Sequence, residues 1–182
     1  EFVVDKVLEL QEPGAGGKVL ELGTGSGAIA LALACQDPDY RITAVDISPE
    51  ALEVAMGNAQ RLGVDHQVEF LQSDLFQRVT GTYKVICSNP PYIRRGELAK
   101  LAPEIGVEPS VALDGGPDGL DFYRRILDQA ASFLEQPGFV VLEIGWDQAE
   151  DVRSLGEKTG FTWVETVKDY GGLDRVVVLR WM

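Results

Sequence analysis

The sequence predicts a doubly wound α/β fold with a mostly parallel sheet of seven strands and a C-terminal antiparallel hairpin. Five short apolar runs alternate with segments of helical pattern, which favours a parallel sheet covered by helices on both faces. The last two runs flank a stretch of turn-forming residues and predict the hairpin. The 182 residues, 45% hydrophobic and 25% charged, fit a single globular domain over residues 1–182.

The first elements follow from short, distinct patterns. Residues 2–10 carry apolar side chains at helical spacing, and Pro13-Gly14 ends that pattern. Residues 18–22 form a short apolar run bounded by glycines, which is typical of a buried strand. Alanine, leucine and isoleucine fill 28–34 and predict a helix, and 41–45 predict the second strand.

A third helix is expected over 49–62. Ser48 is a preferred N-cap, Pro49 suits the first helical position and Gly63 ends the pattern. One face of this helix carries the apolar residues Leu52, Ala55, Met56, Ala59 and Leu62. Two further strands are expected at 68–71 and 83–87.

A proline-rich segment, residues 89–117, separates these elements from the rest of the chain. Beyond it we expect a long helix over 120–134, a strand over 139–144 and a helix over 148–158. The last strands, 163–168 and 175–181, flank Asp169-Tyr170-Gly171-Gly172. We expect this hairpin to add one antiparallel strand at the edge of the sheet.

Glycines alternate in the loop after the first strand, Gly23-Thr24-Gly25-Ser26-Gly27. Such a loop turns tightly and lets its backbone approach a ligand, and the helix after it points free N–H groups toward it. Asp46 ends the second strand about 20 residues further on, where a carboxylate can accept ribose hydroxyls. These features predict a nucleoside-containing cofactor and leave open a nicotinamide dinucleotide or an adenosyl sulfonium.

The third strand is followed by Ser73-Asp74-Leu75. Asp74 could accept the amino group of an adenine while Leu75 packs on the ring, although a turn or cap role for the aspartate is an equal alternative. Because the ends of three parallel strands meet at one edge of the sheet, these groups are expected to converge.

The fourth strand ends in Asn89-Pro90-Pro91-Tyr92. Two prolines fix φ and remove two donors, which leaves the Asn89 side-chain oxygen and the Pro90 carbonyl as acceptors. Tyr92 adds a flat ring beside them. Two acceptors next to a ring suit the –NH2 of a planar substrate, either a carboxamide or a nucleobase, while a rigid structural turn is the alternative interpretation.

Four stretches resemble the HemK/PrmC methyltransferases: Glu-Leu-Gly-Thr-Gly-Ser-Gly (21–27), Ala-Val-Asp (44–46), Gln-Ser-Asp-Leu-Phe (72–76) and Ser-Asn-Pro-Pro-Tyr-Ile (88–93). The resemblance continues at 101–104, 108–109, 112–116, 118–120, 142–145 and 169–171, and so covers nearly the whole chain. Many methyltransferases share the glycine loop, and adenine-N6 enzymes share Asn-Pro-Pro-Tyr. The stretch 108–120 is what favours the glutamine family.

The resemblance implies a Rossmann-like class I methyltransferase that moves a methyl group from S-adenosylmethionine to the side-chain nitrogen of a glutamine, leaving S-adenosylhomocysteine. The implied substrate is the Gly-Gly-Gln motif of class-1 peptide-chain release factors. The implied catalytic residues are Asn89, Pro90 and Tyr92, with Pro91 and Glu108 also binding substrate. The implied cofactor-binding residues are Gly23, Thr24, Gly25, Ser26, Gly27, Asp46, Ile47, Asp74, Leu75 and Asn89.

The family also has a helical N-terminal domain, which we expect to be missing upstream of Glu1. We expect a cytoplasmic monomer whose partner is a release factor, without a metal, a membrane or direct nucleic acid contact. The single histidine, His66, excludes a multi-histidine metal site, and Cys35 and Cys87 match no metal-binding spacing. No apolar run approaches the roughly 18–20 residues needed to cross a bilayer.

The chief alternative is an adenine-N6 methyltransferase that acts on a flipped base in DNA or RNA. The net charge of −13 counts against it, because a negative surface repels phosphates. A non-catalytic, nucleoside-binding subunit is a third possibility, which the intact glycine loop and Asn-Pro-Pro-Tyr disfavour.

Overall fold

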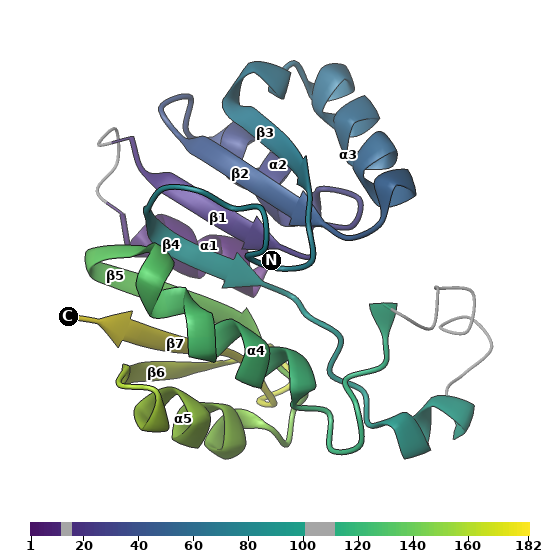
Figure 1. The fold of residues 1–182 in the computed structure, drawn as a ribbon, viewed down its shortest axis with the longest axis vertical. Coiled ribbons are helices and arrows are strands. Elements are labelled where there is room, and N and C mark those ends of the chain that lie inside the picture. Colours follow the sequence, from purple (N-terminus) through teal and green to yellow (C-terminus); the bar gives the residue numbers. More distant parts are fainter. Residues whose placement is uncertain (12–15, 101–111) are drawn as a thin grey trace.

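The structure is a computed structural model of the 182 residues, in which residues 1–11, 16–100 and 112–182 are described. Its strands form one seven-stranded sheet in the order β3-β2-β1-β4-β5-β7-β6 (Figure 1). The strands are β1 (Lys18–Leu22), β2 (Arg41–Asp46), β3 (Val68–Gln72), β4 (Tyr83–Ser88), β5 (Leu134–Glu143), β6 (Thr162–Lys168) and β7 (Asp174–Trp181). The α-helices are α1 (Phe2–Glu9), α2 (Ala28–Gln36), α3 (Pro49–Leu62), α4 (Asp121–Ala130) and α5 (Ala149–Lys158). The predicted doubly wound α/β class is confirmed.

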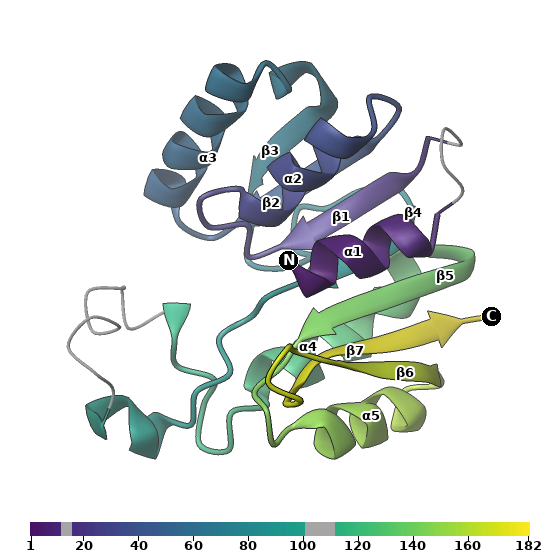
Figure 2. The ribbon, with the colours of Figure 1, turned by 180° about the vertical axis from the view of Figure 1, so that it is seen from behind.

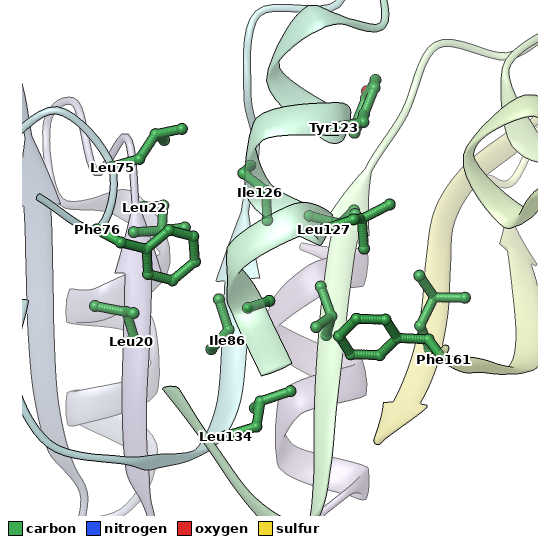
Figure 3. Close-up of a cluster of buried hydrophobic side chains, with 14 of the residues drawn as sticks. Leu20, Leu22, Leu75, Phe76, Ile86, Tyr123, Ile126, Leu127, Leu134 and Phe161 are labelled. Atoms are coloured by element: carbon green, nitrogen blue, oxygen red, sulfur yellow. The ribbon is translucent and has the colours of Figure 1, made fainter. Parts of the chain in front are cut away.

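Helices cover both faces of the sheet. One hydrophobic cluster packs α1, α2 and α3 onto one face, which is nearer the viewer in Figure 2. The other cluster packs α4 and α5 onto the opposite face (Figure 3). Neighbouring strand residues divide between the two, as Val19 and Leu20 do in β1, because successive side chains of a strand point to opposite faces.

The C-terminal hairpin is placed differently from the prediction. The antiparallel strand β7 lies between β5 and β6 and pairs with both, whereas we expected the antiparallel strand at the edge. The residues Val176, Val177, Val178 and Leu179 of β7 are buried, whereas β6 has no buried residue. The apolar strand thus takes the inner place, where both of its faces are covered.

The expected helix over 120–134 is shorter in the structure. Helix α4 ends at Ala130, a 3₁₀ turn spans Ala131–Phe133, and Leu134 already begins β5 opposite Tyr83. Pairing of Leu134 with β4 therefore overrides the helical pattern of the sequence. The other helices and strands agree with the prediction within two residues, apart from the earlier start of β5.

The apolar face expected on α3 is only partly buried. Leu52, Ala55 and Ala59 are buried, but Met56 is 40% exposed and Leu62 is 56% exposed. The stripe of α3 that is buried against the sheet is therefore narrower than the stripe of apolar residues in its sequence. No helix in the described parts of the chain has the length and apolar character to cross a membrane.

The carboxyl ends of β1 to β5 meet at one edge of the sheet, where ligands of open α/β sheets bind. Beyond this edge the chain leaving β4 runs outward through the 3₁₀ helix η2 (Arg95–Lys100) (Figure 1). The strand ends and this outward segment set up the candidate site.

Candidate functional site

The glycine loop, residues 23–27, is fixed against β2 by its backbone. The N–H groups of Gly23 and Thr24 both donate to the Val45 carbonyl, at 2.7 and 2.9 Å. Gly23, Gly25 and Gly27 have φ values of +72°, +55° and +85°, which only glycine adopts without strain. A Cβ atom at Gly23 or Gly25 would meet nothing within 4 Å, so the loop backbone borders open space.

The buried side chain of Glu21 stabilises the glycine loop through hydrogen bonds. Its side chain is 1% exposed, and its Oε2 atom accepts hydrogen bonds from Thr24 Oγ1 at 2.6 Å and from Ala30 N at 3.0 Å. Ala30 lies in the first turn of α2, so one carboxyl oxygen joins the strand, the loop and the helix N-terminus. Burial raises the pKa of Glu21 to about 7. Thr24 is therefore 4% exposed, and its hydroxyl is hydrogen-bonded to Glu21.

The Asp46 carboxylate lies beside the glycine loop. Its Oδ2 atom accepts from Gly25 N at 2.8 Å and its Oδ1 atom from Ser48 N at 2.9 Å. The Asp46 carbonyl also accepts from Ser73 N at 2.9 Å, which ties the ends of β2 and β3 together. The next residue, Ile47, is 57% exposed. The carboxylate therefore stands next to the loop, as the spacing predicted, and an exposed apolar side chain follows it.

Asp74 and Leu75 follow β3 at the same edge of the sheet, but their side chains have different surroundings. Asp74 Oδ1 accepts from the Arg125 guanidinium of α4 at 2.7 Å. Leu75 has φ of +48°, and its side chain is 8% exposed and packed into the hydrophobic cluster on the α4 face (Figure 3). The Leu75 side chain thus contributes to the core beneath the edge.

The Asn-Pro-Pro-Tyr segment, residues 89–92, starts next to the glycine loop. Leu22 of β1 and Ser88 of β4 are register partners, and Ser88 Oγ donates to the Leu22 carbonyl at 2.7 Å. Because neighbouring strands lie about 4.8 Å apart, Gly23 and Asn89 leave the sheet side by side. Asn89 is exposed, Pro90 is buried, and Pro91 and Tyr92 are half-buried.

Beyond Tyr92 the chain pairs with the segment that leads into α4. Ile93 N donates to the Leu113 carbonyl at 3.1 Å, and Gly115 N donates to the Ile93 carbonyl at 2.9 Å. An ion pair between Arg95 and Asp114, 2.9 Å apart, continues the contact. Glu108, the other expected substrate residue, lies outside the described residues.

Two polar residues at this site escaped the sequence reasoning. Asn58 of α3 donates from Nδ2 to the Ser26 carbonyl at 2.9 Å, and the buried Gln148 donates to the Tyr92 carbonyl at 3.0 Å. Each is distant in sequence from the loop that it holds, and a polar residue within or before a helix is ordinarily solvated or a cap. The one signal for Gln148 is its position just after the fifth strand, at the edge where the other groups meet.

His66 and Cys87 are two further residues whose side chains could carry acid–base or nucleophilic chemistry near these strands. His66 is exposed beside a cavity of about 380 Å³ at the opposite edge of the sheet, where Lys18, Arg41 and Tyr83 also contribute to the lining. Cys87 is buried within β4, and burial raises its pKa well above the ordinary value. His66 thus lies away from the glycine loop, and Cys87 belongs to the core of the sheet.

Solved structures with the same architecture include a methyltransferase from Pyrococcus furiosus, with a TM-score of 0.72 and 22% identity over 99% of this chain and 83% of that one. An RNA methyltransferase from Salinibacter ruber, solved with S-adenosyl-L-homocysteine, has a TM-score of 0.62 and 22% identity over 100% and 90%. At these identities the likeness concerns the fold, which is that of the Rossmann-like methyltransferases.

Curated relatives are much more similar in sequence. Release factor glutamine methyltransferases from Agrobacterium fabrum, Thermodesulfovibrio yellowstonii and Moorella thermoacetica are 43%, 41% and 44% identical over 96–99% of this chain. The chain spans 62–66% of their lengths. These relatives confirm the resemblance that the motifs indicated. A profile of the methyltransferase small domain matches residues 5–106, from α1 through the glycine loop to the segment after Tyr92. Because this match covers more than half of the chain, the chain belongs to the methyltransferase small domain family.

Proposed function

We propose that this chain transfers a methyl group from S-adenosylmethionine to the side-chain amide nitrogen of a glutamine in the Gly-Gly-Gln motif of class-1 peptide-chain release factors. The similarity to release factor glutamine methyltransferases supports this substrate. The observation that carries the proposal is a register pair between β1 and β4. Leu22 pairs with Ser88, and Gly23 and Asn89 directly follow these two residues. Acceptors for an –NH2 group thus stand next to a nucleoside-type loop.

The residues at the edge fit an adenosyl cofactor. The backbone of Gly23 and Gly25 borders open space, so a ligand can approach the loop without meeting a side chain. Asp46, held by Gly25 N and Ser48 N, keeps oxygen lone pairs for ribose hydroxyls. The exposed Ile47 offers an apolar surface for the adenine ring, and Asp74 offers an acceptor for its amino group. Of the rest of the expected cofactor set, Ser26, Gly27 and Asn89 follow the same strand ends, whereas the side chains of Thr24 and Leu75 are buried.

The cofactor, when bound, supplies the methyl group as an activated sulfonium substituent, which is the demanding part of the chemistry. The chain must present an amide nitrogen whose lone pair is delocalised into its carbonyl. If Asn89 Oδ1 and the Pro90 carbonyl each accept one N–H, the nitrogen is held in one orientation with its face free. These two hydrogen bonds strengthen as positive charge develops on the nitrogen, so they stabilise the transition state more than the ground state.

Pro91 and Tyr92 complete the substrate position. The two prolines restrict the backbone, so the acceptors need little reorganisation on binding. The half-buried Tyr92 ring gives the planar carboxamide a surface to lie on. Holding the reacting atoms near attack geometry contributes several kcal/mol, up to roughly 7–11 in ideal intramolecular systems.

We place this activity in the cytoplasm, with residues 1–182 as a monomeric catalytic domain.

The direct test is mass spectrometry of a purified release factor after incubation with this chain and S-adenosylmethionine. We expect one added methyl group on the glutamine of the Gly-Gly-Gln motif. A release factor that stays unmodified, while the chain binds cofactor, would contradict the proposed substrate.

Two substitutions separate substrate chemistry from cofactor binding. We expect Asn89→Ala to lower kcat by about 10²-fold or more, because one of two preorganised acceptors is lost, while the cofactor Kd changes little.

We expect Asp46→Ala to raise the cofactor Kd by about 10-fold, since a charged acceptor for the ribose is removed. Calorimetry gives the Kd and methyl transfer gives kcat. Full turnover by Asn89→Ala, or an unchanged Kd in Asp46→Ala, would remove that residue from its role.

A further inference from the structure

Gln148 precedes α5 in the turn formed by residues 145–148, which we name the β5–α5 turn. Its side chain is 1% exposed, and it is the N-cap residue of α5. Its amide is hydrogen-bonded at both ends. Nε2 donates to the Tyr92 carbonyl at 3.0 Å and to the Gly119 carbonyl at 3.2 Å, and Oε1 accepts from Gly145 N at 2.9 Å.

These bonds join three separate segments of the chain. Tyr92 belongs to the Asn-Pro-Pro-Tyr segment, Gly119 to the loop before α4, and Gly145 to the β5–α5 turn itself. Figure 1 shows the chain that leaves β4 running beside the segment that enters α4. A buried amide with both donors used fixes its partners strongly, because any displacement leaves a buried polar group unpaired.

Glycines make room for this arrangement. A Cβ atom on Gly119 would lie 2.5 Å from the Tyr92 carbonyl oxygen and 2.6 Å from Gln148 Nε2. A Cβ atom on Gly115 would lie 2.9 Å from the Pro91 carbonyl oxygen and from Tyr92 C. The backbone of residues 91–92 therefore rests directly on the backbone of residues 115–119, and the Gln148 amide closes the contact.

The same turn holds the outward segment a second time. Asp147 Oδ2 lies 2.9 Å from the Arg94 guanidinium, two residues after Tyr92. This ion pair is partly exposed and weak by itself. Together the two contacts hold the backbone on the far side of Tyr92, while β4 holds it on the near side at Ser88.

We propose that the β5–α5 turn, chiefly through Gln148, positions the Asn-Pro-Pro-Tyr segment so that its acceptors meet the substrate amide in a productive orientation. This inference rests on the proposed function for its catalytic readout. Gln148 does not touch the substrate and is a positioning residue. The turn therefore acts on kcat and leaves the glycine loop and Asp46, which belong to the ends of β1 and β2, unchanged.

The test compares Gln148→Met with Gln67→Met. Methionine keeps the volume of glutamine and removes its hydrogen bonds, and Gln67 is a buried glutamine at the opposite edge of the sheet, before β3. We expect Gln148→Met to lower kcat by about 10- to 100-fold with a cofactor Kd within about twofold of wild type, because misplacing a catalytic segment by an ångström costs on that order. Gln67→Met should keep the wild-type kcat. Equal kcat values for the two variants, or a loss confined to the cofactor Kd, would overturn the proposal.

Hydrogen exchange gives a readout that does not need turnover. The Ile93 and Arg95 amides, which donate to the Leu113 and Gly116 carbonyls, should exchange at least about tenfold faster in Gln148→Met than in Gln67→Met. Unchanged exchange would overturn the positioning role. If the wild-type chain fails to methylate a release factor, the proposed function fails while this comparison still decides the role of Gln148.

A second variant guards against misfolding of the first. Arg94→Met removes the exposed contact from the same turn and leaves the buried amide in place. We expect faster exchange at Ile93 and a kcat reduced by about two- to fivefold. If Gln148→Met does not fold, wild-type exchange and kcat in Arg94→Met would overturn the proposal.

Discussion

Glu21 shows how one buried carboxyl can organise a loop and make the stability of the protein depend on pH. It accepts hydrogen bonds from Thr24 and Ala30 through a single oxygen, Oε2. Burial, the largest influence, raises its pKa from 4.5 to about 7. The folded protein therefore binds a proton at this position between about pH 5 and 7 that the unfolded chain releases. The contribution of Glu21 to stability is greatest below pH 4.5 and is lost as the pH rises through 7.

We predict that Glu21→Gln removes this pH dependence. Glutamine keeps an oxygen for both hydrogen bonds and places an uncharged amide where the proton was. The wild-type free energy of unfolding should fall from pH 5 to pH 8 by on the order of 3 kcal/mol more than that of the variant. Urea unfolding at the two pH values measures the difference.

The matched control is Glu53→Gln, which changes an exposed glutamate of α3. This variant should keep the wild-type pH dependence. A Glu21→Gln protein that loses as much stability between pH 5 and 8 as wild type would show that Glu21 does not carry the proton.

Single residues also mark the limit of prediction from sequence. The positions of Asn89 and Asp46 were predictable, because the end of a parallel strand lies at a known edge of the sheet. The role of Gln148 was not, since its partners Tyr92 and Gly119 lie 56 and 29 residues away. The burial of Leu75 depends on a left-handed backbone that leucine rarely adopts, so sequence reasoning expected its side chain at the ligand.

Among the elements, α3 is the one that local chemistry defines most fully. Ser48 Oγ accepts from Ala51 N at 3.1 Å, Pro49 starts the helix, and Gly63 ends it with φ of +72°. All three features were predicted from the sequence, because caps act over a few neighbouring residues. The end of α4 was not, since it is set by the pairing of Leu134 with Tyr83 across the sheet.

We predict that Ser48→Ala lowers the free energy of unfolding by about 1 kcal/mol, because the first turn of α3 loses its side-chain acceptor. Ser154→Ala, inside α5, is the control, and it should leave stability unchanged or slightly raised, since alanine is the better helix former there. Urea unfolding of both variants makes the comparison. A Ser48→Ala protein as stable as Ser154→Ala would mean that Ser48 does not stabilise the helix.

At the scale of the whole molecule, strand order followed from the sequence only in part. The alternation of strands and helices predicted the parallel strands and the edge where the site lies. The insertion of β7 between β5 and β6 depends on which strand buries more apolar surface against two helical layers. Such a balance belongs to the assembled sheet, although the continuous apolar run of β7 is the local pattern that favours its inner place.

The charge distribution of the whole molecule favours the proposed protein substrate over a nucleic acid substrate. The net charge is −13, and three of the described arginines near the site are paired with acids. Arg94 contacts Asp147, Arg95 contacts Asp114 and Arg125 contacts Asp74, at 2.9, 2.9 and 2.7 Å. Affinity for nucleic acids comes largely from cations that neutralise phosphates and release counterions, and these three arginines have carboxylate partners instead.

We therefore predict weak binding to nucleic acid. For a labelled 20-base-pair DNA duplex and a single-stranded RNA of the same length, the Kd at physiological salt should be at or above about 10⁻⁴ M, the weak end of non-specific binding. Fluorescence anisotropy between 50 and 200 mM salt measures both affinity and salt dependence. Binding that is tight at 50 mM and falls by about 10³-fold or more at 200 mM would require six or more phosphate contacts. That outcome would favour base methylation over the release factor.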